Sequence, residues 1–304
     1  MTDRQAASAA GPRQEPASLT VGSFDGSALA VHCAGAGAKT PLLFVNGVGA
    51  TVALWRRPLA EVAQQRRWVS WDLRGLHQSL PPATDRVDPG THAADALAVM
   101  EHLGIPTFAL VSWSNGSRIA FELAARHADR VEAVAIVNGG HGHSLMRLVH
   151  NLEPSSALPV LAGVAKHFPW AVSIALNQLI SRPELPGLIR QSGLLGRSVD
   201  PAPLIETLRG MAMCDPQRLL ATFEAVAGSP AGELLPAIEA PVLVVAGARD
   251  RMNPVRMSEE MCALIPKSRL QVYDDATHYL PLECCERLVT DIADFLSEAE
   301  ASLR

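Results

Sequence analysis

Residues 110–117 read Leu-Val-Ser-Trp-Ser-Asn-Gly-Ser, and this stretch decides the fold class of the 304-residue chain. An apolar run over 107–112 leads into it, and a helical pattern over 115–127 follows it. Ser114 stands at the turn between them, with a small residue two positions before it and another two positions after. A strand that turns sharply into a helix crowds those two positions and leaves the side chain between them exposed above the sheet. The stretch therefore predicts a serine on a tight strand-to-helix turn.

Strand and helix patterns alternate outward from this turn along most of the chain. Asp25-Gly26 is a hairpin turn signal between two short alternating segments within 19–33. Further strand-like apolar runs lie at 41–45, 68–71, 107–112, 132–137, 241–246 and 269–273, and helical stretches lie at 51–65, 91–103, 115–127, 254–264 and 282–296. Strands and helices that alternate in this way predict an α/β fold, with a mostly parallel central sheet and helices on both faces.

The alternation stops between the two halves of the predicted sheet. Residues 141–230 are helical in pattern and punctuated by Pro and Gly, so we expect a helical cap inserted into a core formed by 19–140 and 231–304. Residues 1–18 are rich in Ala, Ser, Gln and Pro, which predicts a flexible leader. Charged residues and prolines interrupt the apolar stretch 157–180, so no integral membrane span is expected.

Composition and charge narrow the possible partners. Hydrophobic residues make up 48% of the chain, the formal net charge is -5, and no long Lys/Arg cluster is present, so a nucleic-acid partner is not expected. The first residues lack the apolar core of a secretory signal, which favours a cytoplasmic location. The five cysteines contain no Cys-x-x-Cys spacing, and no His/Asp/Glu cluster has metal-ligand spacing. We expect reduced thiols, no metal and no cofactor.

A serine is a weak nucleophile without a base and a carboxylate that orients the base. Asp250 follows the run 241–246, and His278 follows the run 269–273, so each lies at the same edge of the predicted sheet as Ser114. Taken singly, the three residues could be a helix cap, a turn aspartate and a loop histidine. Together they fall in the order Ser, Asp, His, which predicts nucleophile, acid and base. Asp250 is preferred over three other aspartates, Asp215, Asp274 and Asp275, and over Asn138, whose amide carries no charge.

An attacked carbonyl also needs donors for its developing negative charge. The amides of Val48 and Asn115 are the candidates, since one lies in the loop after an early strand and the other directly follows the serine. The alternative for 46–49, Asn-Gly-Val-Gly, is a simple tight turn. We also name candidate substrate contacts: Trp113 in the elbow, Gly47 in this loop, and His141 near the expected cap entrance.

With these motifs in place, the chain resembles the α/β-hydrolase superfamily over nearly its whole length after residue 19. Residues 71–79, Trp-Asp-Leu-Arg-Gly-Leu-His-Gln-Ser, look like the family's Asp-x-Arg-Gly-His-Gly-x-Ser loop. The loop 44–49, Phe-Val-Asn-Gly-Val-Gly, is similar to that of intracellular polyhydroxyalkanoate depolymerases. Ser112 stands where those enzymes carry Gly. The resemblance implies the hydrolase fold and the serine mechanism, without assigning a polymer as substrate.

The sequence thus predicts a serine hydrolase that cleaves a carboxylic ester with a hydrophobic acyl or aromatic group, through an acyl-enzyme. Its partner would be a small-molecule or lipid-like ester. Lactonase, thioesterase and C–C bond hydrolase activities remain open on the same three residues, as do a cofactor-free haloperoxidase and a non-catalytic ligand receptor. Ser114 argues against the dehalogenases and epoxide hydrolases of this superfamily, which use an aspartate nucleophile.

Overall fold

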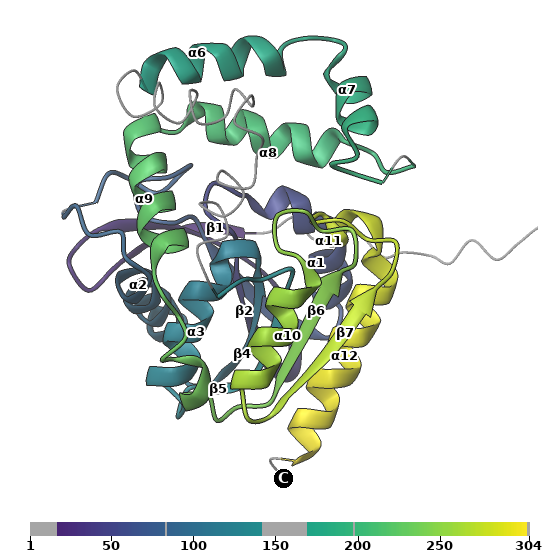
Figure 1. Ribbon diagram of the computed structural model, residues 1–304. Helices are drawn as coiled ribbons and strands as arrows, with labels where there is room; N and C mark the ends of the chain where they lie inside the picture. The colour runs from purple at the N-terminus through teal and green to yellow at the C-terminus, as the bar shows by residue number, and fades with distance from the viewer. Residues whose placement is uncertain (1–16, 83, 142–168, 197, 303–304) are drawn as a thin grey trace, which may run out of the picture.

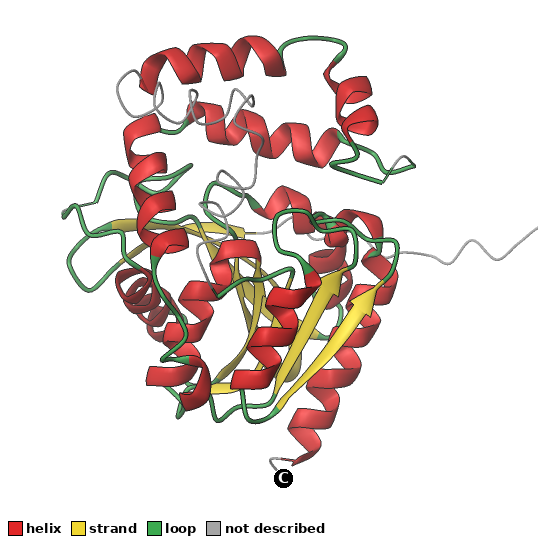
Figure 2. Cartoon of the chain, viewed as in Figure 1, coloured by secondary structure: helices red, strands yellow, loops and turns green. Residues whose placement is uncertain are grey.

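A computed structural model describes residues 17–82, 84–141, 169–196 and 198–302, and the structural statements below concern these residues. They form a seven-stranded sheet with helices on both faces and a layer of helices above one edge (Figures 1 and 2). The α/β class and the mostly parallel central sheet predicted from the sequence are confirmed.

The order of strands along the sheet is β1-β2-β4-β5-β6-β7, and β3 pairs with β2. The pairs β2–β4, β4–β5, β5–β6 and β6–β7 are parallel, as the near-continuous apolar runs predict. The strands are β1 (Ala17–Gly22), β2 (Ala28–Val45), β3 (Arg66–Trp71), β4 (Phe108–Trp113), β5 (Val131–Val137), β6 (Val242–Gly247) and β7 (Ser268–Tyr273).

The first two strands form the predicted antiparallel hairpin, with Gly26 at φ 84° in its turn. The sequence suggested two separate strands within 28–45, whereas the structure has one long element that pairs twice with β3. Residues 31–34 of β2 lie opposite 71–68, and residues 42–44 lie opposite 68–70. Gly37 makes this close packing possible, because a Cβ there would lie 1.7 Å from the Gln65 carbonyl oxygen.

The two faces of the sheet bury two separate apolar clusters. Phe108 and Leu110 of β4 belong to one cluster, and Ala109 and Val111 belong to the other, as the alternation of side chains along a strand requires. Helices α2 (Pro89–His102), α3 (Ser117–Arg126) and α10 (Val255–Leu264) cover the first face, and α1 (Arg56–Val62) and α12 (Cys285–Ser302) cover the second. Short helices η1 (Val52–Trp55), η2 (Ser114–Gly116), η3 (Leu235–Ala237) and α11 (Leu280–Glu283) complete the core.

Between β5 and β6, the described residues form the helices α6 (Pro169–Ile180), α7 (Leu185–Ser192), α8 (Ala202–Met213) and α9 (Pro216–Gly228), followed by the short η3. Figure 1 shows α6, α7 and α8 above the carboxyl edge of the sheet, with α9 descending beside the core. Of the predicted cap, residues 142–168 lie outside the described residues, as do 1–16 of the predicted leader. The domain boundaries therefore stay a prediction.

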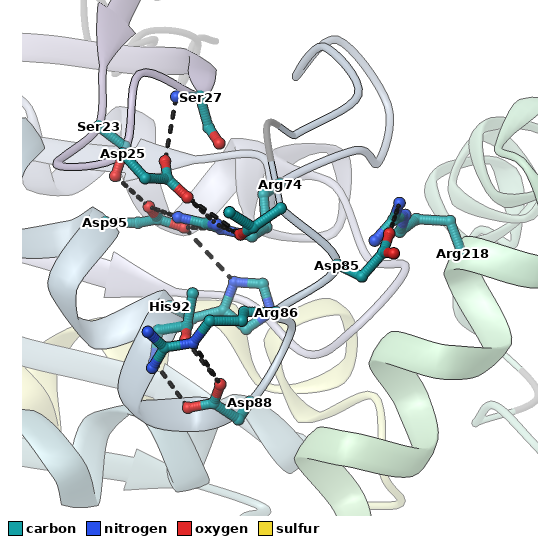
Figure 3. Close-up of polar contacts among 12 residues, drawn as sticks. Ser23, Asp25, Ser27, Arg74, Asp85, Arg86, Asp88, His92, Asp95 and Arg218 are labelled. Atoms are coloured by element: carbon teal, nitrogen blue, oxygen red, sulfur yellow. Dashed lines mark hydrogen bonds and ion pairs between the residues drawn. The ribbon is translucent and has the colours of Figure 1, made fainter.

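A buried ion-pair network fastens the hairpin to the core (Figure 3). Arg74, in the loop after β3, donates from Nε to Asp95 Oδ2 at 2.8 Å and from NH1 to Asp25 Oδ2 at 2.8 Å. Ser23 also donates to Asp95, whose side chain is fully buried together with that of Arg74. Burial would raise the pKa of Asp95, but hydrogen bonds, foremost those from Arg74, outweigh it and lower that pKa. The network joins the β1–β2 turn, the loop after β3 and α2.

Candidate active site

Ser114 lies directly after β4 in the left-handed region, at φ 55°. This region is costly for a residue with a side chain, so the turn is held by its surroundings. Gly116 is required by close packing, because a Cβ there would lie 2.4 Å from the Asn46 carbonyl oxygen and 2.7 Å from that of Val45. The elbow predicted from the sequence thus has the expected backbone, and the end of β2 explains the glycine.

The structure brings the three predicted side chains together. His278 Nε2 lies 2.9 Å from Ser114 Oγ, and His278 Nδ1 lies 2.7 Å from Asp250 Oδ2. His278 and Asp250 are buried, at 3% and 4% exposure, whereas Ser114 is partly exposed. Asp250 Oδ1 accepts hydrogen bonds from the amides of Met252 and Asn253. Both carboxylate oxygens therefore have partners, and Oδ2 faces the imidazole.

The three other aspartates lie elsewhere. Asp215 caps α9 by accepting from the Gln217 amide. Asp274 and Asp275 are exposed, and Asp275 pairs with Arg249 at the surface at 2.5 Å. None of them is recorded as a partner of the His278 ring.

Asn138 proves to be a connection point that the sequence did not reveal. It follows β5 at φ 45° and is fully buried. Its Nδ2 donates to the carbonyl oxygens of Thr277 and His278, both at 2.9 Å, and its Oδ1 accepts from the Gly247 amide at 2.8 Å. One side chain thus joins the ends of β5 and β6 to the loop that carries His278. The sequence showed only that Asn138 cannot supply a charge.

Trp113 packs against the same loop. Its indole Nε1 donates to the His278 carbonyl oxygen at 3.1 Å, and its ring centroid lies 5.1 Å from that of His278 and 5.8 Å from that of Tyr279. The Trp113 side chain is buried, at 5% exposure. These contacts hold the histidine loop against β4, and a substrate contact by Trp113 stays a prediction.

Tyr279 forms part of this aromatic group, with its ring edge-on to His278. Burial, with a smaller effect of the Asp250 charge, raises the pKa of Tyr279 to about 12. The phenol is therefore neutral throughout the physiological range, and Tyr279 adds no charge beside the imidazole.

The loop at 46–49 lies against the elbow, as predicted. Gly47 must be small, because a Cβ there would lie 3.2 Å from Ser114 Cβ and 3.1 Å from Asn115 Oδ1. The Val48 amide, predicted to stabilise an oxyanion, donates to Asn115 Oδ1 at 2.7 Å. The sequence pointed to the backbone of Asn115 and missed its side chain, which can be placed only once the two loops are adjacent.

Side chains from the layer of helices above the sheet lie over this loop. At Gly49 an added Cβ would meet Met211 of α8 at 3.0 Å and Leu219 of α9 at 3.2 Å. His77, at φ 51°, also joins this layer to the loop, since its Nε2 lies 3.1 Å from the Gly49 carbonyl oxygen and its Nδ1 lies 3.6 Å from Cys214 Sγ. Apolar side chains of α8 and α9 and the polar ring of His77 therefore lie against the loop that carries Val48.

The loop carrying the histidine is tied to the same layer on its other side. Glu283 Oε2 accepts from the Thr277 amide at 2.6 Å, while Oε1 accepts from the Gly196 amide at 2.8 Å. Thr277 directly precedes His278, so Glu283 connects the residue next to the imidazole with the segment after α7.

His141, the third predicted substrate contact, faces α10. Its Nε2 lies 3.2 Å from Glu260 Oε2, and its side chain is 17% exposed. Residues 142–168 follow it directly in the chain and lie outside the described residues, so a substrate contact by His141 stays a prediction.

In the described part of the chain, no group of three or more His, Cys, Asp or Glu residues is arranged to hold a metal ion. Within those same residues, no helix combines the length and the apolar character that crossing a membrane requires.

Comparison with known proteins agrees with this architecture. The sequence model of the α/β hydrolase fold family matches residues 40–283, and the chain belongs to that family. The chain is 27% identical over 281 residues to a 2-hydroxymuconate semialdehyde hydrolase from Pseudomonas sp. strain CF600, a match covering 90% of this chain and 91% of that protein. It is 30% identical over 226 residues to a pimeloyl-[acyl-carrier protein] methyl ester esterase from Neisseria meningitidis serogroup B, covering 71% and 73%.

Solved structures share the fold. A thermophilic esterase from Thermogutta terrifontis superimposes with a TM-score of 0.69 at 24% identity, covering 93% of this chain and 99% of that one. An enol-lactonase from Burkholderia xenovorans LB400 gives a TM-score of 0.70 at 21% identity, covering 92% and 100%. Hydrolases that differ in substrate thus share this fold, so the substrate must be argued from the site.

Proposed function

We propose that the protein is a serine hydrolase that cleaves carboxylic esters through an acyl-enzyme, with Ser114 as nucleophile, His278 as base and Asp250 as the orienting acid. The observation that carries the proposal is the chain of contacts from Asp250 through His278 to Ser114, at 2.7 and 2.9 Å. These are the distances that nucleophile, base and orienting group need for proton transfer.

The reaction proceeds in two halves. Ser114 Oγ attacks the ester carbonyl carbon while its proton passes to His278 Nε2, and the carbonyl oxygen gains the negative charge. His278 then gives the proton to the leaving alcohol, which departs and leaves the acyl group on Ser114. Water repeats the sequence and releases the acid. Asp250 keeps Nδ1–H pointing at its carboxylate and stabilises the imidazolium that forms in each half.

An apolar acyl or aromatic group fits the surroundings of the site. Met211 and Leu219 lie over the loop that carries Val48, and the partly exposed ring of Tyr279 lies edge-on to His278. Apolar surface of this kind favours a substrate that loses water contact on binding. We therefore propose a small-molecule or lipid-like ester with a hydrophobic acyl or aromatic part.

The decisive experiment compares wild type with Ser114→Ala on p-nitrophenyl esters from acetate to palmitate. Wild type is expected to hydrolyse the series with an optimum at the acyl length that the site accommodates, and Ser114→Ala is expected to lose about four to six orders of magnitude in kcat. Ser297→Ala is the matched control, since Ser297 is exposed on α12 and bonds only within its own helix. Equal turnover by Ser114→Ala and wild type would refute the assignment.

Hydrolysis of a carbon–carbon bond is the second candidate. It is favoured by the likeness to the 2-hydroxymuconate semialdehyde hydrolase, which extends over 90% of the chain. The same serine could attack the aldehyde carbonyl carbon as its proton passes to His278. The bond from that carbon to its neighbour then breaks, and the neighbouring carbon leaves as a stabilised carbanion that takes up the proton from His278, while the acyl group stays on Ser114 until water releases it. Incubation with 2-hydroxymuconate semialdehyde, followed by the absorbance of its conjugated chromophore, separates the two candidates. Rapid bleaching with poor turnover of every p-nitrophenyl ester would favour this second activity.

A further inference from the structure

The Val48 amide already has a hydrogen-bond partner within the protein. In the turn at 47–50, Ala50 N–H donates to the Gly47 carbonyl oxygen, so the turn itself leaves the Val48 N–H without a backbone acceptor. Asn115 Oδ1 takes that N–H at 2.7 Å. The candidate oxyanion donor is therefore satisfied by a side chain next to the nucleophile.

Asn115 Oδ1 lies close to the nucleophilic side chain, so its hydrogen bond with the Val48 amide bears on catalysis. The point where a Gly47 Cβ would stand lies 3.1 Å from Asn115 Oδ1 and 3.2 Å from Ser114 Cβ. The carboxamide oxygen and the nucleophilic side chain thus flank the same small space. One N–H makes one strong hydrogen bond, so Val48 cannot bind Asn115 Oδ1 and an oxyanion on Ser114 at full strength together.

We infer that the Asn115 side chain is a placeholder in the oxyanion site: it occupies the Val48 amide in the resting enzyme and leaves when the oxyanion forms. This deepens the proposed function and rests on it. Asn115 is only half-buried, so its carboxamide can turn toward solvent and keep its hydrogen bonds there. Its backbone N–H stays in place as the second donor while the side chain moves.

The oxyanion can displace the placeholder, whereas a neutral ester oxygen gains little by doing so. The ester oxygen accepts no more strongly than the Asn115 carboxamide oxygen, and an oxyanion accepts roughly twice as strongly. The free energy of the hydrogen bond between Val48 and Asn115 is subtracted from binding of the oxyanion, so the placeholder weakens binding of the transition state by about the worth of one neutral hydrogen bond.

The test measures affinity for an alkyl trifluoromethyl ketone. Addition of Ser114 Oγ to its carbonyl carbon forms a hemiketal, the carbonyl oxygen becomes the oxyanion, and the serine proton goes to His278. Asn115→Ala removes the competing acceptor, so we expect the ketone to bind about three- to tenfold more tightly, the worth of one neutral hydrogen bond. The serine of Asn115→Ser is too short to reach the Val48 amide, so this variant should also bind the ketone more tightly than wild type. It replaces the alanine variant in the test if that variant does not fold.

Asn115→Asp supplies the opposite perturbation. A carboxylate accepts the Val48 N–H more strongly than an amide and repels a neighbouring oxyanion, so the ketone should bind about ten- to a hundredfold more weakly. This loss relative to wild type should shrink as the pH falls and the new carboxyl takes up a proton. Ser297→Ala on α12 is the control, since Ser297 is exposed and bonds within its own helix, and it should bind the ketone as wild type does.

The outcomes separate this inference from the function on which it rests. Tighter ketone binding by Asn115→Ala and weaker binding by Asn115→Asp support the placeholder. Unchanged or weaker binding by Asn115→Ala, in a variant whose Ser114 still reacts with a fluorophosphonate, overturns the placeholder alone. A wild-type protein that neither reacts with the fluorophosphonate nor hydrolyses esters overturns the proposed function, and the placeholder with it.

Discussion

Replacing Asn138 with alanine should damage both the stability of the protein and the chemistry of Ser114. The substitution removes two hydrogen bonds donated to Thr277 and His278 and one accepted from Gly247. The His278 carbonyl oxygen still accepts from the indole of Trp113. The Thr277 carbonyl oxygen and the Gly247 amide are the two buried backbone groups that lose their side-chain partner. At about 1–3 kcal/mol for each unsatisfied group, the free energy of unfolding should fall by about 2–6 kcal/mol.

Activity should fall because the loop that positions the imidazole loses one of its two side-chain attachments at the His278 carbonyl. A displacement of about 1 Å at a reacting group costs about a hundredfold in rate, so kcat should fall by about that factor while KM changes far less. Steady-state kinetics on a p-nitrophenyl ester, together with urea unfolding, measures both effects. Asn177→Ala on the exposed face of α6 controls for the substitution itself.

Asn138→Asp distinguishes positioning from packing. It keeps the shape and the acceptor for Gly247 but turns two donated hydrogen bonds into contacts between a carboxylate and two carbonyl oxygens. Relative to wild type at the same pH, its kcat should be low at pH 8 and recover in part toward pH 5, where a proton on the carboxyl restores one donor. A variant that unfolds like wild type and keeps the wild-type kcat at both pH values would refute this account of Asn138.

Two further predictions concern the supports of the fold. Asp95→Asn should lower the free energy of unfolding by about 3–5 kcal/mol at pH 7, because it leaves the buried Arg74 without its main charged partner. Folding lowers the pKa of Asp95, so the stabilising charge is lost in acid. Urea unfolding should therefore show the difference between the variant and wild type shrinking as the pH falls below about 4. In Glu283→Gln one carboxylate oxygen becomes an NH2 group, so the side chain can no longer accept from the amides of Thr277 and Gly196 through two oxygens. Limited proteolysis should therefore cut the variant faster than wild type near 193–201. Equal cutting rates would show that this contact does not hold the segment.

The sequence predicted those parts of the site that follow from local pattern. Each of Ser114, Asp250 and His278 follows a predicted strand within a few residues, and parallel strands bring their carboxyl ends to one edge. The alternation of buried runs and helical stretches was therefore enough to expect the three side chains close together. The hairpin at Asp25-Gly26 was equally local, because the turn residues determine it.

The sequence could not predict contacts that depend on how two distant loops meet. Asn138 bonds to residues 139 and 140 positions away along the chain, and Asn115 Oδ1 meets Val48 across 67 positions. Trp113 was named as a candidate substrate contact because of its place in the elbow, and the sequence could not show that its indole bonds to the His278 carbonyl oxygen, 165 positions away along the chain. The continuous β2 was also missed, since its central residues have the Gly-rich composition of a loop.

In this site, the residues that position His278 differ from those that cover the oxyanion loop and limit what can bind there. Asn138, directly after β5, and Trp113, at the end of β4, hold the carbonyl of His278. Met211 and Leu219, both from that layer, lie over the oxyanion loop. Substitutions in the first pair should therefore change kcat, whereas substitutions in the second pair should shift the preferred acyl length. If a Leu219 variant lost kcat equally on esters of every acyl length, Leu219 would be acting on the catalytic geometry at the oxyanion loop and not on the choice of acyl length.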